Sequence, residues 1–267
     1  MKTDLDRPFP LDPAVAAVYR ANGFVHLRGV LAPETLEAFG REITAGVRDL
    51  NTLERPMEER TTYEKAFLQV MNLWRERDAV RAFVFGRRLA RIASELMGTG
   101  GVRLYHDQAL YKEPGGGHTP WHADQYYWPL ATDRCCTAWV PLQDVPLEMG
   151  PLAFAAGSHH VEVGRGLPIS DESEAEMARE LERAALPHVE EPFALGDVSF
   201  HAGWTFHRAG PNRTGRMRAV MTVIYMDAAM RLAAPKNANQ QNDWDTWCPG
   251  AVVGETIATP LNPVLYP

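Results

Sequence analysis

The stretch Trp121-His122-Ala123-Asp124-Gln125 places an imidazole and a carboxylate two residues apart. Side chains alternate along a β-strand with a period of two, so His122 and Asp124 share one face if the stretch is extended. A histidine from a distant strand would complete a set of two histidines and one carboxylate. Such a set holds non-haem Fe(II) and leaves positions open for oxygen and a co-substrate. Alone, the pair indicates metal binding only weakly, because His-x-Asp arises often by chance.

A second group of possible metal ligands lies in the segment from Gly196 to Asn212. Here a Gly-Asp turn, a short expected strand and two histidines precede a basic strand. His201 and His207 are therefore both candidates for the third ligand. The chemistry of the residues does not exclude either of them.

The first hundred residues are expected to be mainly helical. Asp12 and Pro13 form a capping residue and a first helical position, and Gly23 closes this short helix. The pattern of apolar residues predicts a strand at 24–27, a helix from 33 to about 47, and one long helix from 78 to 97.

The pattern changes after Gly101. Short apolar runs separated by Gly/Pro turns predict strands, at 102–112, 137–142, 152–155, 198–201 and 216–226. Several short strands of this kind indicate an antiparallel sandwich or barrel. Residues 171–185 are charged and helical in pattern, and we expect an exposed insert. The segment after Asp227 is expected to be ordered by packing of its tryptophans rather than by regular structure.

Charge and composition argue against several kinds of partner. The net charge of -7 disfavours nucleic acid, and the chain has neither a basic amphipathic segment nor an apolar run of membrane-spanning length. The first ten residues lack the apolar region of a signal peptide, and three cysteines without such a signal fit a reducing compartment. We therefore expect a cytoplasmic protein that acts on a small molecule, without nucleic-acid or membrane partners, as a monomer or small homo-oligomer.

Taken together, the motifs resemble those of the phytanoyl-CoA dioxygenase (PhyH-like) family of Fe(II)/2-oxoglutarate-dependent oxygenases. The matching pieces, in family order, are Lys112-Glu113-Pro114-Gly115-Gly116, Trp121-His122-Ala123-Asp124-Gln125, Gly150-Pro151-Leu152 leading to Gly157-Ser158-His159, Gly196-Asp197, and His207 with Gly210-Pro211-Asn212 and a later arginine. The resemblance implies a mainly β fold with flanking helices and a double-stranded β-helix core, the cupin-like jelly roll. One oxygenase domain would then cover 1–267, with about 1–100 mainly helical, about 101–230 the jelly-roll core, and 231–267 a C-terminal extension.

The resemblance also implies the catalytic centre. By it, His122, Asp124 and His207 bind Fe(II), and 2-oxoglutarate and O2 are the co-substrates. The family places the distal histidine just before a Gly-Pro-Asn turn, which favours His207 over His201. The family's spacing from that histidine assigns the distal carboxylate of 2-oxoglutarate to Arg218, for which a guanidinium fork is suited. Arg216 has the same strand parity, so alternation alone does not decide between the two arginines.

Other candidate residues surround this centre. Thr137 matches a small hydroxyl that helps to hold the 2-oxoglutarate carboxylate in relatives, and Gln108 and Trp139 are further co-substrate candidates. Ala209 stands where the family often has a serine, which removes one possible hydrogen bond to 2-oxoglutarate. The candidates for substrate contact are Gln125, Trp128, His201, Trp204 and Gln69, with Asn72 as a further possibility.

The expected activity is hydroxylation, or another oxidation, of an unactivated C–H bond, coupled to decarboxylation of 2-oxoglutarate to succinate and CO2. Asp124 favours this outcome, because halogenating relatives lack the carboxylate. A small polar or natural-product substrate of secondary metabolism is the favoured class. One alternative is a non-catalytic jelly-roll module that binds a metal or ligand, but it has no need of Arg218. Another is a zinc hydrolase, which lacks an obvious general-base glutamate.

Overall fold

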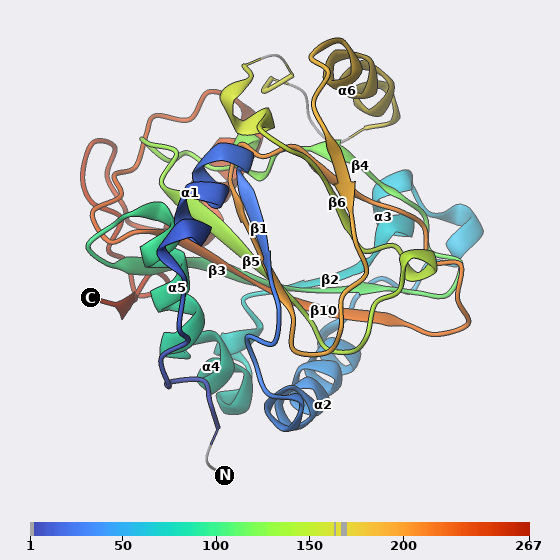
Figure 1. Cartoon of the computed structure of the whole chain (residues 1–267), viewed down its shortest axis with the longest axis horizontal. Coiled ribbons are helices and arrows are strands. Elements are labelled where there is room, and N and C mark those ends of the chain that lie inside the picture. Colours follow the sequence, from blue (N-terminus) through green and yellow to red (C-terminus); the bar gives the residue numbers. More distant parts are fainter. Residues whose placement is uncertain (1–2, 163, 167–169) are drawn as a thin grey trace.

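The computed structural model describes residues 3–162, 164–166 and 170–267. Over these residues two antiparallel sheets form the core, and helices cover the outer side of the larger one (Figure 1). The larger, seven-stranded sheet has the order β1-β8-β5-β10-β3-β11, with β2 also paired to β3, and the smaller, four-stranded sheet has the order β4-β9-β6-β7. The prediction of a mainly β, jelly-roll core with flanking helices is confirmed.

The strands agree with the apolar runs where those runs are long. The larger sheet contains β1 (Phe24–Leu27), β2 (Leu68–Met71), β3 (Val102–Lys112), β5 (Cys135–Pro141), β8 (Val198–Ala202), β10 (Arg218–Asp227) and β11 (Val264–Tyr266). The smaller sheet contains β4 (Thr119–His122), β6 (Leu152–Ala155), β7 (His188–Glu190) and β9 (His207–Ala209). Strands β2, β4, β7, β9 and β11 lie outside the predicted strand ranges, because these segments are polar or short.

The helices of the N-terminal part are α1 (Pro13–Asn22), α2 (Pro33–Leu50), α3 (Thr62–Ala66), α4 (Asp78–Val84) and α5 (Arg87–Met97). The Asp12 carboxylate accepts a hydrogen bond from the Ala14 amide, and Gly23 ends α1 with a φ of 80°. Both ends of α1 are therefore as predicted. A Cβ atom on Gly23 would collide with the side chains of Thr205 and His159, so this glycine also allows close packing.

The prediction of one long helix over 78–97 is wrong, because the helix is divided at Phe85 and Gly86. The N-terminal segment of the chain occupies the break. The Arg88 amide donates to the carbonyl of Leu5, and the Arg87 amide donates to the Asp6 carboxylate. These contacts satisfy the first amides of α5 from a distant part of the chain, which apolar periodicity does not reveal.

Two later helices also differ from expectation. Helix α6 (Asp171–Arg183) is charged, but Met177 and Leu181 are buried in a cluster with Trp121, so it packs on the smaller sheet rather than being fully exposed. Helix α7 (Ala238–Trp247) forms where irregular structure was expected, because the Asn237 side chain caps it by accepting from the Gln240 amide. The C-terminal tryptophans do pack as expected, since Trp244 and Trp247 of α7 lie against a buried apolar cluster.

Short 3₁₀ helices lie in the connections between these elements: η1 (Met57–Glu59), η2 (Leu73–Arg75), η3 (Asp124–Tyr126), η4 (Leu147–Met149) and η5 (Ser158–His160). Two of them, η3 and η4, lie beside the site described next. Among the described residues, no helix combines the length and the hydropathy that a membrane span requires.

Candidate active site

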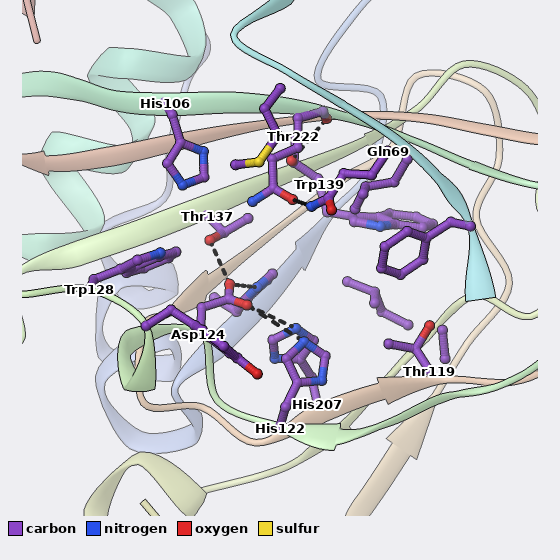
Figure 2. Close-up of a pocket in the computed structure, with 18 of the residues that line it drawn as sticks. Gln69, His106, Thr119, His122, Asp124, Trp128, Thr137, Trp139, His207 and Thr222 are labelled. Carbon is purple, nitrogen blue, oxygen red and sulfur yellow. Dashed lines mark hydrogen bonds and ion pairs between the residues drawn. The ribbon is translucent and has the colours of Figure 1, made fainter. Parts of the chain in front are cut away.

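A cavity of about 250 Å³ lies between the two sheets and is closed on one side by α7. Figure 2 shows ten of its residues by name. The larger sheet contributes inward side chains from β2, β3, β5, β8 and β10, and the smaller sheet contributes them from β4, β6 and β9. The cavity therefore occupies the interior of the jelly roll, where every second side chain of the strands in both sheets points inward.

Two histidines face each other on the smaller sheet. His122 ends β4 and His207 begins β9, and they are direct partners in the antiparallel register, with ring centroids 4.2 Å apart. The Nδ1 atom of His122 lies 2.7 Å from the carbonyl of Pro120, and that of His207 lies 3.0 Å from the carbonyl of Thr205. A carbonyl only accepts, so each Nδ1 carries the proton, and each Nε2 presents a lone pair to the cavity.

Asp124 completes this group. Its Oδ1 atom lies 3.6 Å from the Nε2 atoms of both His122 and His207. The prediction that His122 and Asp124 share the face of one strand is wrong in detail, since β4 ends at His122 and Asp124 begins η3. The turn nevertheless returns the carboxylate to the imidazoles. Their three ligand atoms lie within 4.8 Å of one another, close enough to share one ion.

The other oxygen of Asp124 is held by the larger sheet. Oδ2 accepts a hydrogen bond of 3.0 Å from the Thr137 hydroxyl (Figure 2) and lies 3.3 Å from the Nε2 atom of His201. Thr137 and His201 are register partners on β5 and β8, so the two strands orient the carboxylate together. Oδ1 is thereby left to face the two imidazoles.

The charges of this group suit a metal cation. Burial lowers the pKa of His122 and of His207 to about 4, with each lowered further by a neighbouring histidine and raised by Asp124. Burial opposes ionisation of Asp124, but attraction by His207 and the hydrogen bond from His201 outweigh it, and its pKa lies below the usual range. Two neutral imidazoles and one ionised carboxylate form the donor set that suits Fe(II).

Arg218 lies at the start of β10 and lines the same cavity. Its side chain is buried, its guanidinium lies 5.7 Å from the centre of the Trp139 ring, and one amino group donates to the carbonyl of Gly150. Its Nε atom has no hydrogen-bond partner, and no carboxylate pairs with it within the described part of the chain. Burial lowers its pKa to about 10. Arg216 is exposed and does not line the cavity, so the structure separates the two arginines.

The remaining predicted co-substrate residues have other contacts. Thr137 lines the cavity and its hydroxyl donates to Asp124, while its expected contact with the 2-oxoglutarate carboxylate stays a prediction. The Gln108 amide oxygen accepts from the Gln69 amide nitrogen at 2.7 Å, and this pair lies across β3 and β2 beside Trp139. Ala209 also lines the cavity and leaves room where a serine would stand.

The predicted substrate residues divide into two groups. Trp128, Gln69 and His201 line the cavity, although the Nε2 atom of His201 is directed at Asp124. Gln125 and Trp204 do not line it. The Gln125 amide donates to the carbonyl of Thr132 and is buried, while Trp204 lies under the guanidinium of Arg165. Asn72 bonds to the Trp74 indole in the core instead.

Several cavity residues were not predicted. His106 has the parity of Gln108 and Leu110 on β3, and all three line the cavity, so a strict reading of alternation would have found it. Asp243 and Trp247 reach the cavity from α7, and Tyr63 reaches it from α3. No local pattern marks these three, because only the tertiary fold brings the two helices to the cavity.

The family model for phytanoyl-CoA dioxygenase (PhyH) matches residues 19–220. The chain belongs to this family. The predicted family is thus confirmed, and with it an Fe- and 2-oxoglutarate-dependent enzyme. A search of curated protein sequences found no match.

Solved structures extend the similarity over nearly the whole chain. The epimerase SnoN from nogalamycin biosynthesis, in complex with Fe3+, α-ketoglutarate and nogalamycin RO, is 27% identical, with a TM-score of 0.79 over 95% of this chain and 100% of its own. The carbocyclase SnoK from nogalamycin biosynthesis is 25% identical, with a TM-score of 0.77 over 96% of this chain and 98% of its own. EctD from S. alaskensis, at 20% identity and a TM-score of 0.70 over 96% of this chain and 88% of its own, shares the fold.

Proposed function

We propose that this enzyme oxidises an unactivated C–H bond of a small molecule, with iron held by His122, Asp124 and His207. One observation carries the proposal: a buried guanidinium without a carboxylate partner in the described chain, Arg218, lines the same cavity as this donor set. A buried charge without a partner is costly, so the cavity favours a ligand that brings a carboxylate to Arg218. A 2-oxo acid with a distal carboxylate can bind the metal through its 2-oxo acid end and Arg218 through its distal carboxylate.

The chain's own residues orient the reaction. His122 and His207 keep their Nε2 lone pairs on the metal side because backbone carbonyls hold their Nδ1 protons. Thr137 and His201 turn Asp124 so that one oxygen faces the imidazoles. Arg218, supported by the Trp139 ring, positions 2-oxoglutarate through its distal carboxylate.

Bound iron supplies the oxidising chemistry: 2-oxoglutarate and O2 give succinate and CO2, one oxygen atom enters succinate, and in hydroxylation the other enters the substrate C–H bond. Aromatic and aliphatic walls exclude water from the cavity, with Phe67, Leu110 and Leu152 among them. The similarity to an epimerase and a carbocyclase makes stereochemical inversion and ring closure the outcomes to be distinguished from hydroxylation.

We further propose that the chain functions as one oxygenase domain. The N-terminal part contributes β1 and β2 to the larger sheet, and the C-terminal extension contributes α7 to the cavity wall. Neither part is therefore separable from the site. The small-molecule class of the substrate rests on the cavity's volume, which suits a ligand of modest size.

Turnover with candidate small molecules tests the reaction. The purified enzyme is incubated with Fe(II), ascorbate, 2-oxoglutarate and air, and succinate and product are measured by mass spectrometry. We expect succinate in step with a product that has gained one oxygen atom, and none with the Asp124→Ala variant. A product of unchanged mass would indicate stereochemical inversion instead of hydroxylation. A product that has lost two hydrogens would indicate ring closure. Succinate formation undiminished in Asp124→Ala contradicts the proposed site.

A further inference from the structure

The cavity contains a second charged group that the proposed chemistry does not use. Asp243 of α7 lines it and is only 9% exposed. Its Oδ2 atom accepts a hydrogen bond of 3.0 Å from the Tyr105 hydroxyl, and no Lys, Arg or His pairs with it among the described residues. Burial raises the pKa of Asp243 to about 7, although the bond from Tyr105 opposes this rise. A buried carboxylate without a cation is costly to maintain in a structure.

Aromatic rings surround this end of the cavity. Trp128 and Trp247 both line it, and the ring of His106 lies 6.1 Å from the first and 5.4 Å from the second, measured between centroids. The Nδ1 atom of His106 is buried without a hydrogen-bond partner, and burial lowers the pKa of this histidine to about 3. The imidazole is therefore neutral and adds no positive charge to the group.

This aromatic end is separate from the co-substrate side. Figure 2 places His106 and Trp128 on one side of Asp124, and Trp139 and Thr119 on the other. Arg218 lies over the Trp139 ring, so the 2-oxoglutarate carboxylate belongs to that side. The aromatic end is thus the part of the cavity left for the organic substrate.

We propose that the aromatic end binds a protonated amine of the substrate, with the ammonium beside Asp243 and its alkyl groups against Trp128 and Trp247. A carboxylate and electron-rich ring faces attract an ammonium together, and both attractions are stronger in a desolvated cavity. The inference rests on the proposed function, because it assumes that the substrate occupies this cavity. It narrows the substrate class to small molecules that carry a basic nitrogen.

A neutral polar group is the competing occupant, since a protonated carboxyl could donate to a carbonyl or hydroxyl. Two probes of the same shape distinguish them. N,N-Dimethylethanolamine carries a protonated nitrogen at neutral pH, and 3-methylbutan-1-ol has a CH group in its place. Their binding to the enzyme with Fe(II) and 2-oxoglutarate, without oxygen, is followed by calorimetry and by tryptophan fluorescence.

We expect the amine to bind at least tenfold more tightly than the alcohol. Asp243→Asn should weaken amine binding about tenfold and leave alcohol binding unchanged. Asp245→Asn, an exposed change of the same kind on the same helix, should alter neither. Trp247→Leu, at a partly exposed position, should also weaken the amine more than the alcohol.

Equal binding of the two probes, a lack of saturable amine binding, or equal effects of Asp243→Asn and Asp245→Asn would overturn the amine site. The visible charge-transfer band of the Fe(II)–2-oxoglutarate chelate is recorded in the same samples. A band that persists in Asp243→Asn shows that this variant is folded and that the co-substrate site is intact. A wild-type enzyme that develops the band but shows no preference for the amine refutes this inference alone, whereas a wild-type enzyme without the band refutes the proposed function.

Discussion

Asp124 is the residue on which the proposed centre depends most. Its two oxygens have different neighbours, since Oδ2 is engaged by Thr137 and His201 while Oδ1 faces His122 and His207. A carboxylate held in this way offers one oxygen to a metal and cannot rotate freely. Groups that orient ligands in this manner commonly change metal affinity when they are removed.

Thr137→Val tests that orientation. The valine keeps the shape of the side chain but removes the hydrogen bond to Oδ2, so we expect Fe(II) to bind about 10- to 100-fold more weakly. The affinity is measured by anaerobic titration. The exposed Thr52→Val change is the control and should have no effect. Unchanged Fe(II) binding in Thr137→Val would show that the hydroxyl does not orient Asp124.

Arg218→Met tests the co-substrate site. Methionine fills much of the space but removes the charge, so we expect the KM for 2-oxoglutarate to rise about 100-fold, while Fe(II) affinity stays near that of the wild type. Arg216→Met removes the exposed arginine of the same strand parity and should leave KM unchanged. If the two variants have similar KM values, the assignment of Arg218 is wrong.

At this scale, residue types and spacing, together with the resemblance to the family, predicted much of the site. His122, Asp124, His207, Arg218 and Trp128 were all named from the sequence, and all line one cavity. The contact of Thr137 could not be foreseen, because it depends on how η3 turns Asp124 toward β5. The parity of β3 would have revealed His106, but nothing local to α7 marks Asp243.

At the scale of elements, the motif segments meet around Arg218. The Asn212 amide donates to the carbonyls of Lys112 and Glu113, and the buried Nζ atom of Lys112 donates to the carbonyl of Gly210 at 3.0 Å. The loop after β3 and the turn after β9 are thereby tied together at the start of β10. This explains physically why a lysine, a glycine-rich turn and a Gly-Pro-Asn turn occur in one chain with the arginine.

Gly150→Ala should disturb this junction. Gly150 has a φ of 72°, its carbonyl accepts from Arg218, and an added Cβ atom would lie 2.2 Å from the carbonyl oxygen of Gly210. We expect the free energy of unfolding to fall by about 3 kcal/mol, measured by urea denaturation. Gly115→Ala also has positive φ, at 74°, but open space around it, so a loss of about 1 kcal/mol is expected. Equal losses would mean that the contact with Gly210 does not matter.

Element prediction succeeded where local patterns decide the structure and failed where tertiary contacts do. The capping residues Asp12 and Gly23 bound α1 as expected. The division between α4 and α5 comes from Leu5 and Asp6, which satisfy amides far along the chain. Helix α7 forms on a segment without clear periodicity because its cap and its packing against the sheet compensate for that weakness.

At the scale of the whole molecule, both ends of the chain contribute to one architecture. The N-terminal part supplies two strands and the outer helices, and the C-terminal part supplies β11 and the helix that closes the cavity (Figure 1). Composition and strand spacing predicted the class of fold. The jelly-roll core became an expectation only through the resemblance to a family, since strand spacing alone left a sandwich or a barrel.

Stability should depend on pH through Asp243. Its pKa is about 7 in the folded protein and near 4 in an unfolded chain, so the folded state holds a proton that the unfolded state has lost between these values. The stabilisation of the folded state by this bound proton is fully present below about pH 4 and is lost as the pH rises to 7. Relative to Asp243→Asn, the wild type should therefore lose about 1–3 kcal/mol of stability between pH 5 and pH 8, as measured by urea unfolding. A constant difference between the two proteins would show that burial does not shift this carboxyl.

The central claim is that His122, Asp124 and His207, with Arg218, form one site for Fe(II) and 2-oxoglutarate. The most direct measurement is the visible charge-transfer band of the anaerobic chelate, recorded for the wild type, His207→Ala and His201→Ala. The wild type should develop the band, His207→Ala should lose it, and His201→Ala should retain it with weaker Fe(II) binding. A band that survives in His207→Ala, or one abolished only in His201→Ala, would contradict the assignment.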